Sequence, residues 1–105
     1  MSKAFWVIAW RSVSDPSAVE RYAATAGAAI QAQGGRILAR GNPARTYESG
    51  LPSRLAIVEF ESLERAVSAY ESPEYQGAVA HLVGAAERDL RIIVGVGQEE
   101  HRPPS

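Results

Sequence analysis

The stretch Ala4-Phe5-Trp6-Val7-Ile8-Ala9-Trp10 is apolar at every position. A strand with one face in water alternates apolar and polar residues, so an unbroken apolar run predicts a strand that is covered on both faces. The sequence leaves open whether the even-numbered or the odd-numbered side chains of this run point into the interior. In either case the strand belongs at the centre of the fold, and other segments must pack against both of its faces.

The segment that follows this strand carries the signals of a helix. Asp15 is suited to accept a hydrogen bond from a free backbone N–H, and Pro16 suits the first helical position. Apolar side chains then recur at helical spacing from Val19 to Ile30. Gly34-Gly35 ends the pattern, because glycine adopts the left-handed cap conformation without strain. We predict one helix between Pro16 and this glycine pair.

Shorter elements follow in the same way. They are, in chain order, a strand at Arg36–Arg40, a turn at Gly41-Asn42-Pro43, a possible extension of the hairpin at Arg45–Glu48, a strand at Arg54–Phe60, a helix capped by Ser62, a second helical piece restarted at Ser72-Pro73, and a strand at Leu90–Val94. The order β-α-β-β-α-β with right-handed crossovers predicts an α+β, ferredoxin-like sandwich, with a four-stranded antiparallel sheet and both helices on one face. We assign residues 1–97 to this single domain and expect 98–105 to be a flexible polar tail.

Composition excludes several classes of protein. The 105 residues are 46% hydrophobic and 22% charged, and the net charge of −1 lacks the basic excess of a nucleic-acid binder. There is no cysteine, and His81 has no second histidine at metal-ligand spacing, so we expect no metal site. No apolar run approaches the length of a membrane helix, and the start does not have the pattern of a secretory signal. These features predict a cytoplasmic protein that binds neither membranes nor nucleic acid.

Two helices cover one face of such a sheet, and the other face is left open. Strict alternation along the strands places these side chains on the open face: Arg36, Leu38, Arg40, Leu55, Ile57, Glu59, Arg91 and Ile93. An apolar sheet face in water is an association site, and the simplest cover is the same face of a second copy. We therefore expect a homodimer.

Four blocks of sequence carry a resemblance to a known family. They are Asp15-Pro16 with Tyr22, Gly34–Gly41, Arg54–Phe60 and Tyr70–Gln76. In this order and spacing the chain resembles the bacterial family catalogued as domain of unknown function thirteen-thirty, from about Ala4 to Val94. The resemblance implies a dimeric α/β barrel, a superfamily that includes cofactor-free monooxygenases, lactone isomerases and ligand-binding domains. Family members often carry a polar residue, such as histidine, late in the first strand, where this chain has Ala9-Trp10.

The charged residues of the open face are the first candidates for a site. Arg36 and Arg40 are suited to hold a carboxylate, with Glu59 as a catalytic base or orienting group. The alternative is a structural ion pair at the dimer contact. Trp6 and Trp10 share one face of the first strand and are candidates to stack on a planar ligand, although such residues more often pack in an apolar core or anchor a dimer. Tyr70 and Tyr75 flank the helix break and are candidates to bind a ligand through their hydroxyls, although such tyrosines more often pack their rings and satisfy the hydroxyl nearby.

Three functions compete on these observations. The first is the binding of a small acidic organic molecule in a cleft at the open sheet face. The second is a cofactor-independent enzyme, similar to a monooxygenase or an isomerase, that uses Glu59. The third is a structural or interaction dimer without a ligand. We expect no cofactor in any of them, and fold alone does not choose among them.

Overall fold

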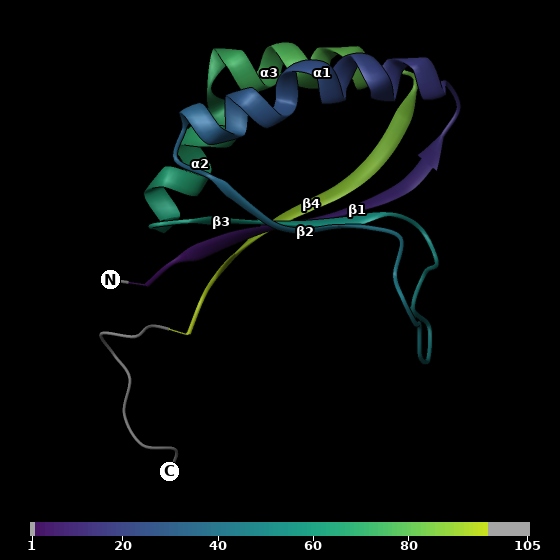
Figure 1. The fold of residues 1–105 in the computed structure, drawn as a ribbon, viewed down its shortest axis with the longest axis horizontal. Coiled ribbons are helices and arrows are strands. Elements are labelled where there is room, and N and C mark those ends of the chain that lie inside the picture. The colour runs from purple at the N-terminus through teal and green to yellow at the C-terminus, as the bar shows by residue number, and fades with distance from the viewer. Residues whose placement is uncertain (1, 97–105) are drawn as a thin grey trace.

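The computed structural model describes residues 2–96. Its elements are β1 (Ala4–Val13), α1 (Pro16–Ala32), β2 (Arg36–Gly41), β3 (Leu55–Phe60), α2 (Leu63–Glu71), α3 (Pro73–Val79), the 3₁₀ turn η1 (Ala80–Leu82) and β4 (Ala86–Val94). The sheet has the order β2-β3-β1-β4, and all neighbouring strands are antiparallel. Figure 1 shows the helices on one side of the sheet and none on the other. This arrangement confirms the predicted ferredoxin-like fold.

The first helix begins and ends where the sequence predicts. The Asp15 carboxylate accepts a hydrogen bond from the backbone N–H of Ser17 at 3.1 Å, which satisfies one of the free donors of the first turn. At the other end Gly34 adopts a positive φ of 86°. Gly35 is required for a different reason, since a Cβ there would lie 2.6 Å from Cγ2 of Ile30 and 2.7 Å from the Phe60 ring. The glycine pair therefore turns the chain and lets β2 pass close to the core.

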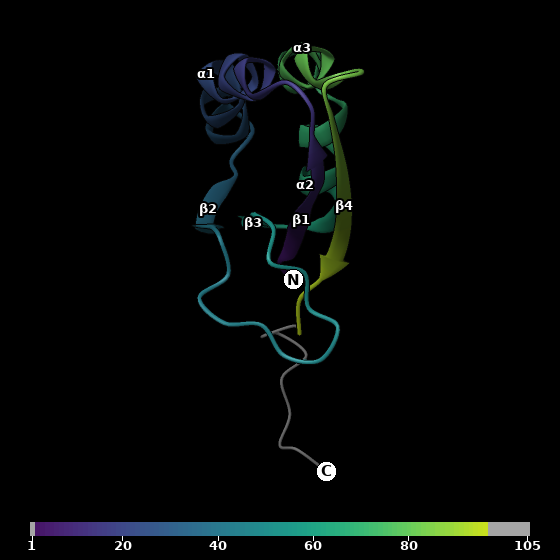
Figure 2. The same ribbon diagram turned by 90° about the vertical axis from the view of Figure 1, so that its right-hand side faces the viewer.

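Ser72 separates the second and third helices. Its hydroxyl donates to the carbonyl of Ala69 at 2.8 Å and accepts from the backbone N–H of Tyr75 at 3.2 Å. One side chain thus ends α2 and caps α3, with Pro73 at the first position of the new helix. The break changes the direction of the chain, and Figure 2 shows α1 and α3 side by side above the sheet. None of the helices within residues 2–96 is both long and apolar enough to cross a membrane.

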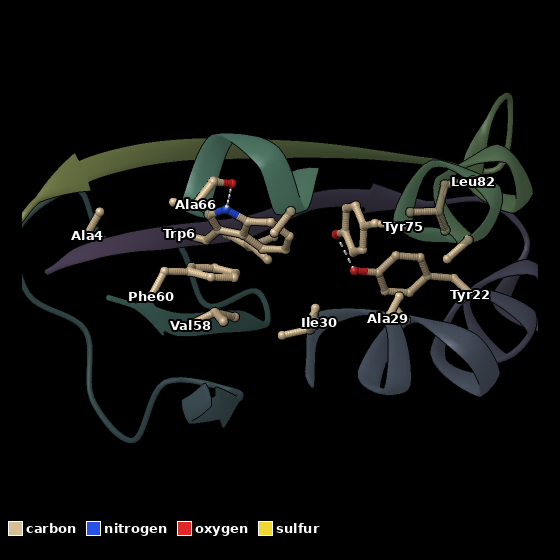
Figure 3. Packing of buried hydrophobic residues seen from close by; sticks show 14 of the residues in the cluster. Ala4, Trp6, Tyr22, Ala29, Ile30, Val58, Phe60, Ala66, Tyr75 and Leu82 are labelled. Atoms are coloured by element: carbon tan, nitrogen blue, oxygen red, sulfur yellow. Dashed lines mark hydrogen bonds between the residues drawn. The ribbon is translucent and has the colours of Figure 1, made fainter. Parts of the chain in front are cut away.

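The even-numbered side chains of β1 point into the core. Trp6 is fully buried, its indole N–H donates to the carbonyl of Ala66 at 2.9 Å, and its ring packs on Phe60 at 4.9 Å and Tyr75 at 4.8 Å between centroids. Figure 3 shows these rings between the strands and the helices. The odd-numbered side chains lie on the open face, where Val7 is exposed. This decides the orientation that the apolar run left open.

Two predicted boundaries are wrong. β4 begins at Ala86 and not at Leu90, so it includes Arg88 and Asp89. Residues 45–48 do not extend the hairpin but lie in the loop between β2 and β3, which Figure 2 shows running beyond the sheet. The expected tail, 98–105, lies outside the described residues.

Candidate functional site

The predicted cluster of Arg36, Arg40 and Glu59 is only partly assembled. Arg36 stands opposite Glu59 in the register of β2 and β3, so the two share the open face. The ion pair that Glu59 forms is with Nζ of Lys3, at 3.6 Å. Arg36 itself is exposed and has no ion pair with any residue between 2 and 96. Glu59 is therefore a half-buried surface carboxylate that already has a cationic neighbour.

Arg40 lies on the opposite side of the sheet from the one predicted. Ile37 stands opposite Val58, but Ala39 stands opposite Ile57 and Arg40 opposite Ala56, because Leu38 is an extra residue in β2. Such a bulge shifts every later side chain of the strand to the other face. The placement of Arg40 on the open face is therefore wrong, and the side chain belongs to the helix-covered face together with that of Ala56.

On this face a cavity of about 90 Å³ lies between α1 and the sheet. It is lined by Ile8, Trp10, Val19, Tyr22, Ala23, Ala26, Gly27, Ile30, Ile37, Arg40, Arg54, Ala56, Val58 and Arg88. Most of the wall is apolar, and the small residues Ala23, Ala26 and Gly27 come from one side of α1. Arg40 and Arg54 are exposed and form the rim, whereas Arg88 is half-buried. The space exceeds the roughly 30 Å³ that one water occupies, so it admits a small molecule or the end of a larger one.

Arg88 forms the polar inner wall of this cavity. It stands opposite Trp10 in the register of β1 and β4. Its guanidinium carbon lies 5.2 Å from the centroid of the Trp10 ring and 4.8 Å from that of Tyr22, both within the range of cation–π attraction. Nη1 donates to the hydroxyl oxygens of Tyr22 at 3.0 Å and Tyr75 at 3.2 Å. The guanidinium is thus held in one position by two rings and two phenols.

The two phenols also contact each other. The hydroxyl oxygens of Tyr22 and Tyr75 lie 2.6 Å apart, and the two rings pack edge-on with 6.0 Å between their centroids. Figure 3 marks the contact between the hydroxyls with a dashed line. Burial raises the pKa of the Tyr75 phenol well above its ordinary value, and the neighbouring Tyr22 raises it further, against the opposing effect of Arg88. Tyr75 is therefore a neutral phenol throughout the physiological range of pH.

Charge distinguishes the cavity from the rest of the surface. Three arginines and no carboxylate line it. Arg40, Arg54 and Arg88 form no ion pair with the described residues, whereas on the open face Asp89 binds Arg11 at 2.9 Å and Arg91 at 2.8 Å. Hydrogen bonds from Arg91 and Arg11 hold the pKa of Asp89 below its usual range. The cavity therefore carries an excess of positive charge with no carboxylate beside it, whereas the open face has Glu59 and Asp89 next to its cations.

The predicted aromatic residues divide between core and site. Trp6 is completely buried, with its indole N–H satisfied, and does not line the cavity. Tyr70 packs edge-on against Trp6 at 6.1 Å and lies outside the cavity as well. Tyr75 contributes through its hydroxyl, which holds Tyr22 and Arg88. Of the residues predicted to bind a ligand, Arg40 lines the cavity. Tyr75 does not line it, but its hydroxyl holds the lining residues Tyr22 and Arg88 in place.

Trp10, a candidate to stack on a ligand, lines the cavity, and three further residues of its wall were not anticipated: Tyr22, Arg54 and Arg88. Arg88 had a readable signal, because it lies two residues before Leu90 and four before Ile92, on the same face of a strand. Tyr22 was assigned to the buried stripe of α1, which is correct, but its hydroxyl end was not considered. No cluster of three His, Asp or Glu side chains that could hold a metal ion occurs between residues 2 and 96.

Comparison with known proteins agrees with this architecture. A family model described as Domain of unknown function (DUF1330) matches residues 3–96. No curated protein matches the chain. Among solved structures, a protein of unknown function from Rhodopseudomonas palustris has a TM-score of 0.67 at 18% identity, over 90% of this chain and 83% of that one.

Two further structures share the fold. A dimeric ferredoxin-like protein of unknown function from Thermobifida fusca has a TM-score of 0.62 at 12% identity, over 89% of this chain and 91% of that one. SnoaB, a cofactor-independent oxygenase from Streptomyces nogalater, has a TM-score of 0.65 at 12% identity, over 96% of this chain and 100% of its own. At these identities the likeness establishes the fold alone.

Proposed function

This chain belongs to the DUF1330 family, and we propose that it binds a small organic acid in the cavity between α1 and the sheet. The observation that carries the proposal is the presence of three arginines around an apolar cavity that contains no carboxylate. The class of ligand is the one expected from the sequence, but its place is on the helix-covered face and not on the open one.

The physical argument begins with Arg88. A half-buried guanidinium has lost part of its hydration, and it is stable in that place because two phenols and two rings replace some of the water. Nη2 and Nε make no hydrogen bond to the described residues. A carboxylate at this wall gains charge-assisted hydrogen bonds from Arg88 that are worth about 1.5–3 kcal/mol each. The apolar wall then accommodates the carbon skeleton.

The experiment compares two arginines of the same strand. Thermal shift and isothermal titration calorimetry with a panel of small mono- and dicarboxylic acids should detect binding to the wild type. Arg40→Gln should weaken it strongly, because the side chain forms the rim of the cavity. Arg36→Gln removes the same charge from β2 on the other face and should leave binding intact. If no acid binds, or if both variants lose binding equally, the cavity is not the site.

An enzyme in this cavity is the second candidate. SnoaB, which shares the fold, is described as a cofactor-independent oxygenase, and arginines around an acidic substrate would stabilise an enolate by their charge. Glu59 does not fit as its base, since the sheet lies between that carboxylate and the cavity. An oxygen electrode, together with mass spectrometry of each acid that binds, separates turnover from binding alone.

We also infer a homodimer, formed through the open face. Val7, Leu55, Ile57 and Ile93 are exposed there, and a structural neighbour is described as dimeric. Burying these apolar side chains against a second copy is favourable by roughly 25 cal/mol per Å² of apolar surface. In this arrangement the α1 cavity of each protomer stays on the outer side of its sheet, so dimerisation and ligand binding are compatible. A dimer without a ligand remains the third candidate.

A further inference from the structure

We propose that the ligand is a dianion without hydrogen-bond donors, a short dicarboxylate in the simplest case, and that the Tyr22 hydroxyl determines this specificity by donating to it. This inference rests on the proposed function and specifies its ligand. It follows from three features of the cavity: the direction of one hydrogen bond, the donor character of the lining and the separation of its charges.

The direction of the bond between the two phenols follows from counting protons. Each phenol has one proton to donate, and Arg88 donates to both oxygens. Across the 2.6 Å contact one phenol donates to the other, which leaves one proton for another acceptor. If that proton were on Tyr75, it would be completely buried with no acceptor among the described residues, at a substantial cost. Tyr75 therefore donates to Tyr22, and Tyr22 has its proton free for the cavity that it lines.

The polar side chains of the cavity consequently offer donors to a ligand. Arginine side chains have no acceptor, and the Tyr22 oxygen already accepts from Arg88 and Tyr75. A ligand that brings its own N–H groups or a positive charge finds no partner in these side chains and is repelled by the arginines. A group that only accepts, such as a carboxylate, finds several donors. The lining thus favours acids and disfavours amino acids of the same size.

The number and position of the charges indicate two anionic groups. A monoanion leaves two of the three arginines without compensation. Arg88, with Tyr22 beside it, is half-buried at the inner wall, and Arg40 and Arg54 are exposed at the rim. Between these ends the wall is apolar, with Val19, Ala26 and Val58 among its residues. Two carboxylates joined by methylene groups match this pattern, with one at the inner wall and one at the rim.

Calorimetry with matched acids tests the ligand class. Malonate, succinate and glutarate are compared with propionate, butyrate and valerate, which have the same numbers of carbons, and with aspartate, which is succinate with an ammonium group. We expect at least one dicarboxylate to bind about tenfold or more tightly than its monocarboxylate partner, and aspartate to bind about tenfold more weakly than succinate, as the loss of one charged contact implies. Monocarboxylates that bind as tightly as dicarboxylates would overturn the inference but leave the proposed function standing. If no acid binds, the inference and the proposed function both fail.

A pair of variants tests the role of Tyr22. Tyr22→Phe removes the donor that faces the ligand and should weaken dicarboxylate binding about tenfold or more. Tyr70→Phe is the matched control, because it removes a phenol hydroxyl from a ring that packs on Trp6 outside the cavity, and it should change the affinity less than about threefold. Equal weakening in both variants, or none in Tyr22→Phe, would contradict the assigned direction. If Tyr22→Phe does not fold, the comparison of succinate with aspartate in the wild type still decides the donor character of the cavity.

Discussion

The hydroxyl oxygens of Tyr22 and Tyr75 lie 2.6 Å apart, and Nη1 of Arg88 donates to both. This contact joins α3 and β4 to α1, and Tyr22 and Tyr75 are 53 residues apart in the sequence. It therefore has two consequences, one for the stability of the fold and one for the shape of the cavity.

Tyr75→Phe should destabilise the protein by about 1–2 kcal/mol, because it removes a buried hydrogen bond without changing the ring packing on Trp6. Urea denaturation followed by circular dichroism measures the free energy of unfolding. Tyr47→Phe is the control, since that side chain is 74% exposed in a loop. Equal stability of Tyr75→Phe and the wild type would mean that the phenol contact contributes nothing to the fold.

Stability should fall at alkaline pH because of Tyr75. Its pKa is raised in the folded protein above the ordinary value of 10.0, so above about pH 10 the unfolded chain releases a proton that the folded protein retains. The free energy of unfolding then decreases as the pH rises, and below this range Tyr75 contributes no pH dependence. Urea denaturation at pH 8 and pH 11 should show a smaller loss for Tyr75→Phe than for the wild type. The idea is refuted if the two lose stability in parallel.

Gly27 offers a way to close the cavity without disturbing the core. It lies in α1 on the cavity wall, and an added Cβ would meet nothing within 4 Å. Gly27→Leu should improve the helix by up to about 1 kcal/mol and at the same time abolish the thermal shift by acids. Gly77→Leu is the matched control, since Gly77 is exposed in α3, has equal space and does not line the cavity. Acid binding that survives Gly27→Leu would place the ligand elsewhere.

Light scattering after size exclusion tests the open face. The wild type should have about twice the chain mass of 11.3 kDa. Ile57→Arg places a charge on the apolar face and should give a monomer. Val83→Arg makes the same change at a side chain that is 81% exposed next to η1 and should remain a dimer. A monomeric wild type, or a dimeric Ile57→Arg, would exclude this interface.

Local signals were sufficient for most of the fold. The caps at Asp15 and Ser62, the restart at Ser72-Pro73 and the glycine pair mark helix ends through chemistry that acts within a few residues, so the sequence alone predicts them. The apolar run of β1 identifies the central strand, but its orientation depends on which side the helices pack. That choice is made by the tertiary structure.

The site was less predictable, for two physical reasons. The side of the sheet on which Arg40 lies depends on the extra residue at Leu38, and a bulge is set by the pairing of two strands and not by the residues of one. Arg88 lies outside the predicted last strand, which begins at Leu90, whereas β4 begins at Ala86. The class of ligand, a small organic acid, was predicted from a surplus of arginine. It stays a prediction, and the proposed place for the acid is now the helix-covered face of the sheet.

The bulge at Leu38 also affects how the protein avoids aggregation. β2 is an edge strand, and its outer row of backbone N–H and C=O groups is a template on which another chain can add a strand. An extra residue interrupts the regular spacing of that row, and the charges of Arg36 and Arg40 oppose the approach of a second copy of the same edge. Both features disfavour edge-to-edge growth into fibres, and they leave the open face as the surface through which we expect two copies to associate.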